Sequence, residues 1–226
     1  MVIVDVLSFS TAVVTAVEKG AYIYPCSSHQ EAAKVTARVG GESAVRRMEV
    51  PAKGRFSLSP LTFEQAEPGT KVAVASPNGA ACARYGRGAP FVFAGCLLNA
   101  AAVSKTVSEI LARSNLAATV IACGERVRLT AGKSVIRWAV EDYLGAGAIL
   151  SYLQFEKYPD ATVCEGAFHS CREVLGEIIS GCESGRELAE WGFGDDAEFA
   201  ARLDVSDCVP VLKSGRFEPF DPSDSK

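Results

Sequence analysis

Residues 1–11 read MVIVDVLSFST, and this stretch decides the fold class. The run from Val2 to Val4 is apolar and β-branched, which predicts a buried strand. Asp5 follows it directly, and residues 10–20 then show apolar spacing that closes on Gly20, as in a short helix. A strand, a carboxylate and a helix in this order are typical of α/β proteins, which present polar side chains where strands end.

The same alternation continues along the chain. We expect further strands at 21–26, 70–76, 90–95, 117–124 and within 208–220, with helical stretches at 27–39, 77–86, 99–114, 137–155, 160–181 and 184–204. Residues 42–69 are rich in Gly, Pro and charge, which predicts a long loop. The pattern predicts an α/β fold, layered α/β/α with a mostly parallel or mixed sheet. We expect one unit over 1–226, with subdomains of about 1–100 and 101–220 as the alternative, and a polar tail at 221–226.

Composition excludes several classes of protein. The net charge is −4 and the pI is about 5.4, which argues against a nucleic-acid-binding protein. No apolar run is long enough for a membrane span, and no signal peptide is present, so we expect a cytoplasmic protein without membrane contact. The eight cysteines form no C-x-x-C pair and lie mostly among small apolar residues, as buried reduced thiols do. A catalytic thiol is the alternative, with His29 or His169 as its base.

Polar residues gather where the expected strands end. Asp5, the run 76–79 (SPNG), the run 95–99 and the run 124–126 (GER) each follow a strand. Ligands of open α/β sheets bind at such ends, and helix N-termini there favour anions. Each feature also has a structural explanation: Asp5 and Asn99 suit helix caps, and PNG suits a turn. Walker A, G-x-G-x-x-G and G-x-S-x-G motifs are absent, which disfavours nucleotide-binding and serine-hydrolase functions.

Glu141 and Asp142 form an adjacent pair of carboxylates with apolar neighbours on both sides. A solvated helix face explains such a pair, but the neighbours Ala139, Val140 and Leu144 indicate that at least one carboxylate faces the interior. Carboxylates near strand ends suit a hard cation such as Mg²⁺, which takes oxygen ligands and keeps several waters.

Several motifs occur together in an order that resembles the 2-phosphosulfolactate phosphatase (ComB) family. They are VDVLSFSTAVVTAVEKGA, VGGES, SLSPLTF, SPNGAACA, GCLLNAAAV, VIACGE, WAVEDYLGAGAI and LDVSDCVPVL, and they span residues 2 to about 217. The resemblance implies a ComB-like fold and a Mg²⁺-dependent hydrolase that converts 2-phosphosulfolactate into sulfolactate and phosphate. In methanogens this phosphatase step belongs to coenzyme M biosynthesis. The resemblance also implies a homodimer and a small phosphorylated sulfonate or carboxylate as substrate.

The matching motifs imply the site residues. The expected catalytic residues are Asp5, Glu42, Asn78, Glu141 and Asp142. The expected substrate-binding residues are Ser10, Thr11, Ser59, Gly79, Asn99 and Arg55. The expected Mg²⁺ ligands are Asp5, Glu42 and Asp142. Arg46, Arg47, Lys53 or Arg55 of the long loop could supply counter-charge to the anion. Attack by water is favoured over an aspartyl-phosphate on Asp5, because the D-x-D signature of haloacid dehalogenases is missing.

The sequence departs from the family pattern in three places. Ser8 stands where many relatives have Arg, and Ser76-Pro77 stands where many have Thr-Thr. Relatives usually carry residues ahead of the first strand, so we expect a strand to be missing and the edge beside Val2–Val4 to be bare. These departures keep two alternatives open: a non-catalytic anion-binding pseudoenzyme of the same fold, and a phosphatase for another small phosphorylated sulfonate or carboxylate.

Overall fold

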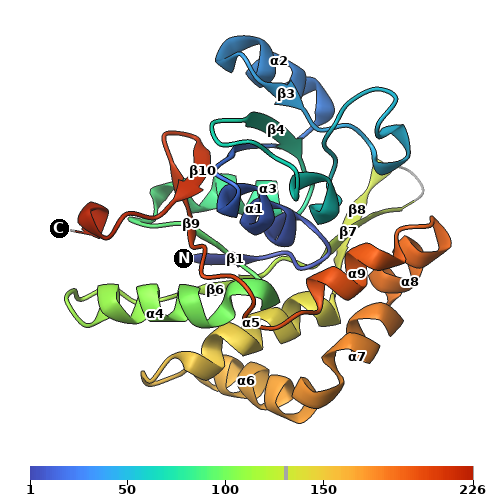
Figure 1. Cartoon of the computed structure of the whole chain (residues 1–226). Coiled ribbons are helices and arrows are strands. Elements are labelled where there is room, and N and C mark those ends of the chain that lie inside the picture. Colours follow the sequence, from blue (N-terminus) through green and yellow to red (C-terminus); the bar gives the residue numbers. More distant parts are fainter. Residues whose placement is uncertain (130–131, 226) are drawn as a thin grey trace.

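The structure is a computed structural model that describes residues 1–129 and 132–225 (Figure 1). The strands are β1 Val2–Val4, β2 Tyr22–Cys26, β3 Glu42–Ser43, β4 Lys71–Ala75, β5 Phe93–Gly95, β6 Val120–Ala122, β7 Glu125–Arg128, β8 Ser134–Arg137, β9 Pro210–Lys213 and β10 Arg216–Pro219. The helices are α1 Phe9–Glu18, α2 His29–Val39, α3 Gly79–Tyr85, α4 Ala100–Leu111, α5 Val140–Tyr152, α6 Pro159–Cys171, α7 Leu175–Gly181, α8 Glu183–Glu190 and α9 Gly194–Ala200. None of these helices has the length and apolar character to cross a membrane, within the described ranges.

Eight strands form one mixed sheet in the order β3-β4-β2-β10-β9-β5-β1-β6. The pairs β3-β4, β4-β2, β5-β1 and β1-β6 are parallel. The hairpin of β9 and β10, from the C-terminal part of the chain, joins these two parallel groups through antiparallel pairs. The expected α/β fold with a mostly parallel or mixed sheet is confirmed.

The first strand lies inside the sheet, and the expectation of a bare edge beside it is wrong. Val2 pairs with Phe93 of β5 on one side and with Val120 of β6 on the other. Both sets of backbone hydrogen-bonding groups of β1 therefore have strand neighbours. A strand with neighbours on both sides is a rigid support for the carboxylate that follows it.

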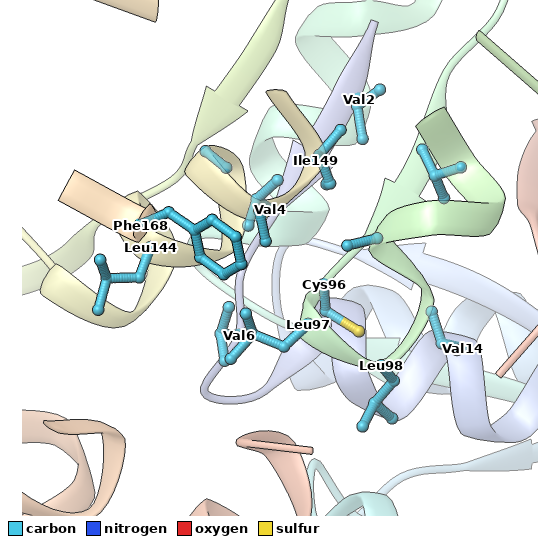
Figure 2. Close-up of a cluster of buried hydrophobic side chains, with 14 of the residues drawn as sticks. Val2, Val4, Val6, Val14, Cys96, Leu97, Leu98, Leu144, Ile149 and Phe168 are labelled. Atoms are coloured by element: carbon cyan, nitrogen blue, oxygen red, sulfur yellow. The ribbon is translucent and has the colours of Figure 1, made fainter. Parts of the chain in front are cut away.

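The side chains of β1 alternate between two buried clusters. Val2 and Val4 pack in a cluster with residues of α4 and α5, including Ile149 (Figure 2). Ile3 points to the opposite face and packs in a second cluster with Phe9 of α1. Because successive side chains of a strand point to opposite faces, this division means that helices cover both faces of the sheet. The layered arrangement predicted from the sequence follows from this alternation.

Helix α1 is buried along nearly its whole length. Every residue from Phe9 to Val17 is buried. A helix that is apolar on all sides is stable only in a core. Figure 1 shows α1 near the centre of the molecule, while α5 lies next to β1 and β6 and packs against α4 and α6. The site described below forms at the N-terminus of this central helix.

Two features of the fold differ from the expected elements. The predicted helix over 137–155 begins only at Val140, because Ser134–Arg137 forms strand β8. This strand pairs antiparallel with β7 in a separate two-stranded sheet, which the sequence pattern did not indicate. The long segment 42–69 contains only the two-residue strand β3 and short 3₁₀ turns, as expected. All eight cysteines are free thiols, and each is buried or half-buried, which agrees with the structural explanation.

Candidate active site

Asp5 lies where β1 ends, and two helices direct backbone N–H groups at its carboxylate. The amide of Phe9, the first residue of α1, donates to Oδ1 at 3.2 Å. The amide of Gly79, the first residue of α3, donates to Oδ2 at 2.8 Å. The Ser76 hydroxyl lies 3.4 Å from the same Oδ2. Asp5 therefore serves as a helix cap and, at the same time, is a buried acid held in one orientation by three elements.

Gly79 has to be glycine because of this arrangement. A Cβ atom at this position would lie 2.7 Å from Cγ of Phe9 and 2.8 Å from Oδ2 of Asp5. Such distances are well inside van der Waals contact. The absence of a side chain lets the start of α3 approach Asp5 closely enough for the amide to donate its hydrogen bond.

Asp142 anchors the first turn of α5 to the ends of two strands. Its Oδ1 accepts from the Val6 amide at 2.7 Å, and its Oδ2 accepts from the Gly124 amide at 2.9 Å. Its neighbour Glu141 is also buried, at 3% exposure. The apolar neighbours of this pair predicted that at least one carboxylate faces the interior, and in the structure both are buried.

Asn78 and Glu125 form the next contact around the site. The Asn78 amide nitrogen donates to Glu125 Oε2 at 2.9 Å, and Asn78 Oδ1 accepts from the Arg126 amide at 3.0 Å. Asn78 thus connects the loop after β4 to the start of β7. Glu125 is the functional residue that the expected set lacked, although its place at a strand end was the available signal.

These carboxylates repel one another in a buried environment. Burial raises the pKa of Asp5, and the charge of Glu141 adds to the rise. Burial also holds the pKa of Asp142 well above its usual range, with repulsion from Asp5 and Glu141 as further causes. Burial and the charge of Asp5 together raise the pKa of Glu125 to about 7. The four acids, here called the acidic wall (Asp5, Glu125, Glu141 and Asp142), carry charge that their surroundings do not fully compensate.

A basic group faces the same region from the long loop. Arg47 donates through Nε to Oδ2 of buried Asp196 at 2.8 Å and through Nη2 to the Ser8 hydroxyl at 2.6 Å. The Ser59 hydroxyl donates to the other oxygen of Asp196 at 2.5 Å. We call Arg47, Asp196, Ser8 and Ser59 the arginine wall. No local pattern indicated Asp196, since its partner Arg47 lies 149 positions away in the chain.

A cavity of about 170 Å³ has lining residues from both walls: Asp5 and Glu125 of the acidic wall, and Ser8 and Arg47 of the arginine wall. Asn78, Glu187 of α8 and Trp191 line it as well. The cavity is small and is lined by groups of opposite charge, which suits a small ligand that carries an ester phosphate and a further anionic group.

Several expected substrate-binding residues have structural bonds instead. The Ser10 hydroxyl donates to the Ile3 carbonyl, and the Thr11 hydroxyl donates to the Val6 carbonyl. Asn99 is fully buried: its side-chain oxygen accepts from the Cys96 amide, and its nitrogen donates to the carbonyls of Ala94 and Cys208. The run 95–99 does not line the described cavity. These side chains support the loop backbone around the site.

Glu42 and Arg55 lie apart from the cavity. They pair with each other, with Nη2 of Arg55 2.5 Å from Oε1 of Glu42; the Arg55 side chain is 58% exposed and that of Glu42 is 37% exposed. Glu42 belongs to β3 at the edge of the sheet, whereas β1 lies near the opposite edge. The structure therefore brings Asp5, Asn78, Glu141 and Asp142 together but leaves Glu42 outside this group. Ser59 belongs to the arginine wall, and Gly79 touches Asp5 through its backbone.

The donor set fits Mg²⁺ only in part. The acidic wall offers oxygen ligands and uncompensated negative charge, which a divalent cation beside Asp5 would neutralise. Within the described residues, however, no three acidic, histidine or cysteine side chains are placed to enclose a metal ion. This arrangement matches a cation that takes one or two protein carboxylates and completes its shell with water and substrate phosphate.

Comparisons with known proteins show which family the chain is similar to. A family model described as 2-phosphosulpholactate phosphatase matches residues 1–215. A "Probable 2-phosphosulfolactate phosphatase" of Carboxydothermus hydrogenoformans is 30% identical over 96% of this chain and 88% of its own length. The "2-phosphosulfolactate phosphatase" of Methanothermobacter thermautotrophicus is 25% identical over 96% of this chain and 88% of its own length.

Proposed function

The chain belongs to the 2-phosphosulpholactate phosphatase family, a family of phosphoric monoester hydrolases, and from this premise we propose that it hydrolyses 2-phosphosulfolactate to sulfolactate and phosphate. The observation that carries the proposal is the placement of Asp5. A buried carboxylate, held by the first amides of α1 and α3, lies at the base of a cavity with an acidic wall and an arginine wall. A phosphate ester with a second anionic group has charges that complement both walls.

We propose Mg²⁺ as the cofactor, with Asp5 as its direct protein ligand and Asp142 behind it. The support is that both acids are buried and accept hydrogen bonds from backbone amides, with no Lys or Arg side chain bonded to either in the described residues. When bound, the cation supplies charge neutralisation to the phosphoryl oxygens. Glu42, expected as a ligand from the family motifs, has no part in this proposal because it pairs with Arg55 at the sheet edge.

Water is the proposed nucleophile. Both carboxylate oxygens of Asp5 accept a backbone hydrogen bond, which holds the carboxylate in one orientation and leaves lone pairs for a cation. The D-x-D signature of enzymes that form an aspartyl-phosphate is missing at Asp5, and this supports direct hydrolysis. The oxygen of the water forms the new bond to phosphorus as the ester bond to the sulfolactate oxygen breaks.

Glu125 is the proposed general acid for the leaving group. An alkoxide is a poor leaving group, so a proton donated as the ester bond breaks lowers the barrier. The pKa of Glu125, raised to about 7, leaves a substantial protonated fraction near neutral pH. Asn78 fixes the position of Glu125 through its amide hydrogen bond. The proton goes to the sulfolactate oxygen, and one proton of the attacking water later returns to Glu125.

Three expectations from the family resemblance stay predictions within this proposal. They are a homodimeric assembly, a cytoplasmic location and a place for the reaction in coenzyme M biosynthesis where the host makes that cofactor.

The direct test is phosphate release from 2-phosphosulfolactate by the purified chain. We expect turnover with Mg²⁺, loss of turnover with EDTA and recovery when excess Mg²⁺ is added. Two comparison substrates are used. 2-Phospholactate lacks the sulfonate, and isopropyl phosphate lacks both the sulfonate and the carboxylate. Saturable sulfolactate binding without turnover of any substrate at any Mg²⁺ concentration would instead support the pseudoenzyme.

A further inference from the structure

We propose that Arg47 is the specificity-determining residue that binds the second anionic group of the substrate, the sulfonate or the carboxylate. This inference rests on the proposed function and extends it, because the family comparisons assign no residue to that group. The argument comes from the position of the guanidinium, the way it is fixed, and the donors it leaves available.

Arg47 is the one Lys or Arg side chain among the described residues that line the cavity. The other ionisable side chains there are Asp5, Glu125 and Glu187, which are all acidic. The phosphate, sulfonate and carboxylate of 2-phosphosulfolactate meet strong repulsion in a cavity of this composition unless positive partners are present. The acidic wall can receive the phosphate only with a cation, which leaves Arg47 as the available partner for the sulfonate or the carboxylate.

The guanidinium is held in one position before any ligand arrives. Asp196 orients it through Nε, while Ser8 and the Leu58 carbonyl accept from Nη2. The Arg47 side chain is 15% exposed and that of Asp196 is 2% exposed, so water screens this pair weakly. Asp196 is itself fixed by the Ser59 hydroxyl. A preorganised guanidinium loses little conformational entropy when it binds an anion.

The third nitrogen of the guanidinium has no protein partner. Nη1 forms no hydrogen bond within the described part of the chain, whereas Nε and Nη2 are both engaged. The two N–H groups of Nη1 can therefore donate to an incoming sulfonate or carboxylate without breaking the bond to Asp196. Charge-assisted hydrogen bonds of this kind are the strong class, and the planar guanidinium matches the geometry of both anions.

Ser8 explains how the guanidinium reaches this place. The small hydroxyl at position 8 leaves room for Arg47 to approach from the loop, and it accepts the shortest hydrogen bond that Arg47 makes, at 2.6 Å. A longer side chain at position 8 would occupy the same space beside the cavity. The positive charge beside the cavity thus comes from Arg47 of the long loop, because the turn between β1 and α1 contributes only the Ser8 hydroxyl.

The competing explanation is that the Arg47–Asp196 pair merely fastens the loop to α9. The two explanations differ in how an Arg47 variant treats different substrates. A purely structural pair, once broken, lowers activity on every phosphate ester alike. A pair that binds the second anion lowers activity only on esters that carry one.

The experiment compares kcat/KM of wild type, Arg47→Met and Arg47→Lys on 2-phosphosulfolactate, 2-phospholactate and isopropyl phosphate, with Mg²⁺ present. We expect Arg47→Met to lose about 100-fold on 2-phosphosulfolactate and less than about twofold on isopropyl phosphate. Loss on 2-phosphosulfolactate alone identifies the sulfonate as the bound group, and loss on 2-phospholactate as well identifies the carboxylate. An equal loss on all three esters overturns the proposal.

Arg84→Met is the matched control, since Arg84 forms an exposed ion pair with Glu31 away from the cavity. Arg47→Lys keeps the charge but loses the planar donors, and it decides the question if Arg47→Met does not fold. We expect a loss of about tenfold for the Lys variant on 2-phosphosulfolactate only.

Calorimetry with sulfolactate separates this inference from the proposed function. If the wild type binds sulfolactate and Arg47→Met does not, the inference holds even where no ester is hydrolysed. If both bind sulfolactate equally well, Arg47 does not bind the second anion, whatever the turnover.

Discussion

The two walls of the cavity both bury charged side chains, but the arginine wall pairs its acid with a cationic side chain and the acidic wall does not. In the arginine wall, Asp196 is 1% exposed and contacts the guanidinium of Arg47 at 2.8 Å, with a serine hydroxyl on its second oxygen. In the acidic wall, Asp5 and Asp142 are each 3% exposed. Asp142 accepts hydrogen bonds from backbone amides alone, whereas Asp5 accepts them from backbone amides and the Ser76 hydroxyl. No arginine or lysine is bonded to either of these acids in the described residues.

The difference shows which wall is completed by the protein and which is left for a ligand. A buried ion pair with all its hydrogen bonds made holds the loop in place, and removing one partner leaves an unpaired charge. Buried acids that repel one another store unfavourable energy, which is released when a cation or a proton enters. The arginine wall is therefore held rigid by its own ion pair, and the acidic wall can bind a cation or a proton.

Replacing Asp5 with Asn tests the acidic wall and has the largest expected effect. We expect phosphate release from 2-phosphosulfolactate to fall about 10³-fold, because the proposed cation ligand is lost. Stability measured by denaturant unfolding should fall by about 1–3 kcal/mol, since the NH₂ group of Asn cannot accept one of the two backbone hydrogen bonds that Asp5 accepts. Exposed Asp160→Asn is the control variant. Activity at the wild-type level in Asp5→Asn contradicts the assignment.

Replacing Glu125 with Gln tests the proposed general acid. The pKa of Glu125 is raised to about 7, so its protonated form predominates below that pH and disappears above it. We therefore expect kcat of the wild type to fall as the pH rises through about 7. Glu125→Gln should lower kcat about 10²-fold and abolish this alkaline decrease. An unchanged pH profile in the variant would show that another group donates the proton.

Replacing Asp196 with Asn tests the arginine wall through stability. We expect the free energy of unfolding to fall by about 3 kcal/mol, because Arg47 keeps its charge in a poorly hydrated position without its partner. Asp195→Asn, in the same turn of α9 but exposed, should change stability by less than about 0.5 kcal/mol. If the two variants unfold at the same denaturant concentration, the arginine wall is not the stabilising contact described above.

Replacing Gly79 with Ala tests the close approach of α3 to Asp5. We expect a loss of about 2 kcal/mol in stability, since the new methyl group overlaps Phe9 and Asp5. Gly176→Ala is the matched control, because Gly176 also lies in the first turn of a helix and a Cβ there meets no atom within 4 Å. Equal thermal unfolding of both variants would show that α3 can shift without cost.

The local parts of the fold could be predicted from the sequence. The β-branched run at Val2–Val4 and the helical patterns over 27–39 and 99–114 are local signals, and each predicted the right element. The same holds for Asp5, whose place directly after a strand indicated its position at a strand end. The apolar neighbours of Glu141 and Asp142 predicted that at least one of these carboxylates is buried.

The long-range contacts could not be predicted in this way. Arg47 and Asp196 are 149 positions apart, and nothing in either segment indicates the other. Glu42 is a second such case: its motif made it an expected site residue, whereas the structure places it in β3 at the far edge of the sheet, paired with Arg55. The insertion of the β9-β10 hairpin into the middle of the sheet is likewise a tertiary event that no local pattern encodes.

Calorimetric titration with Mg²⁺ tests the central claim most directly, using wild type, Asp5→Asn and Glu42→Gln. The acidic wall as described predicts saturable binding to the wild type, loss of binding in Asp5→Asn and wild-type binding in Glu42→Gln. Binding that survives in Asp5→Asn, or that disappears only in Glu42→Gln, would place the cation elsewhere and contradict the account of the two walls.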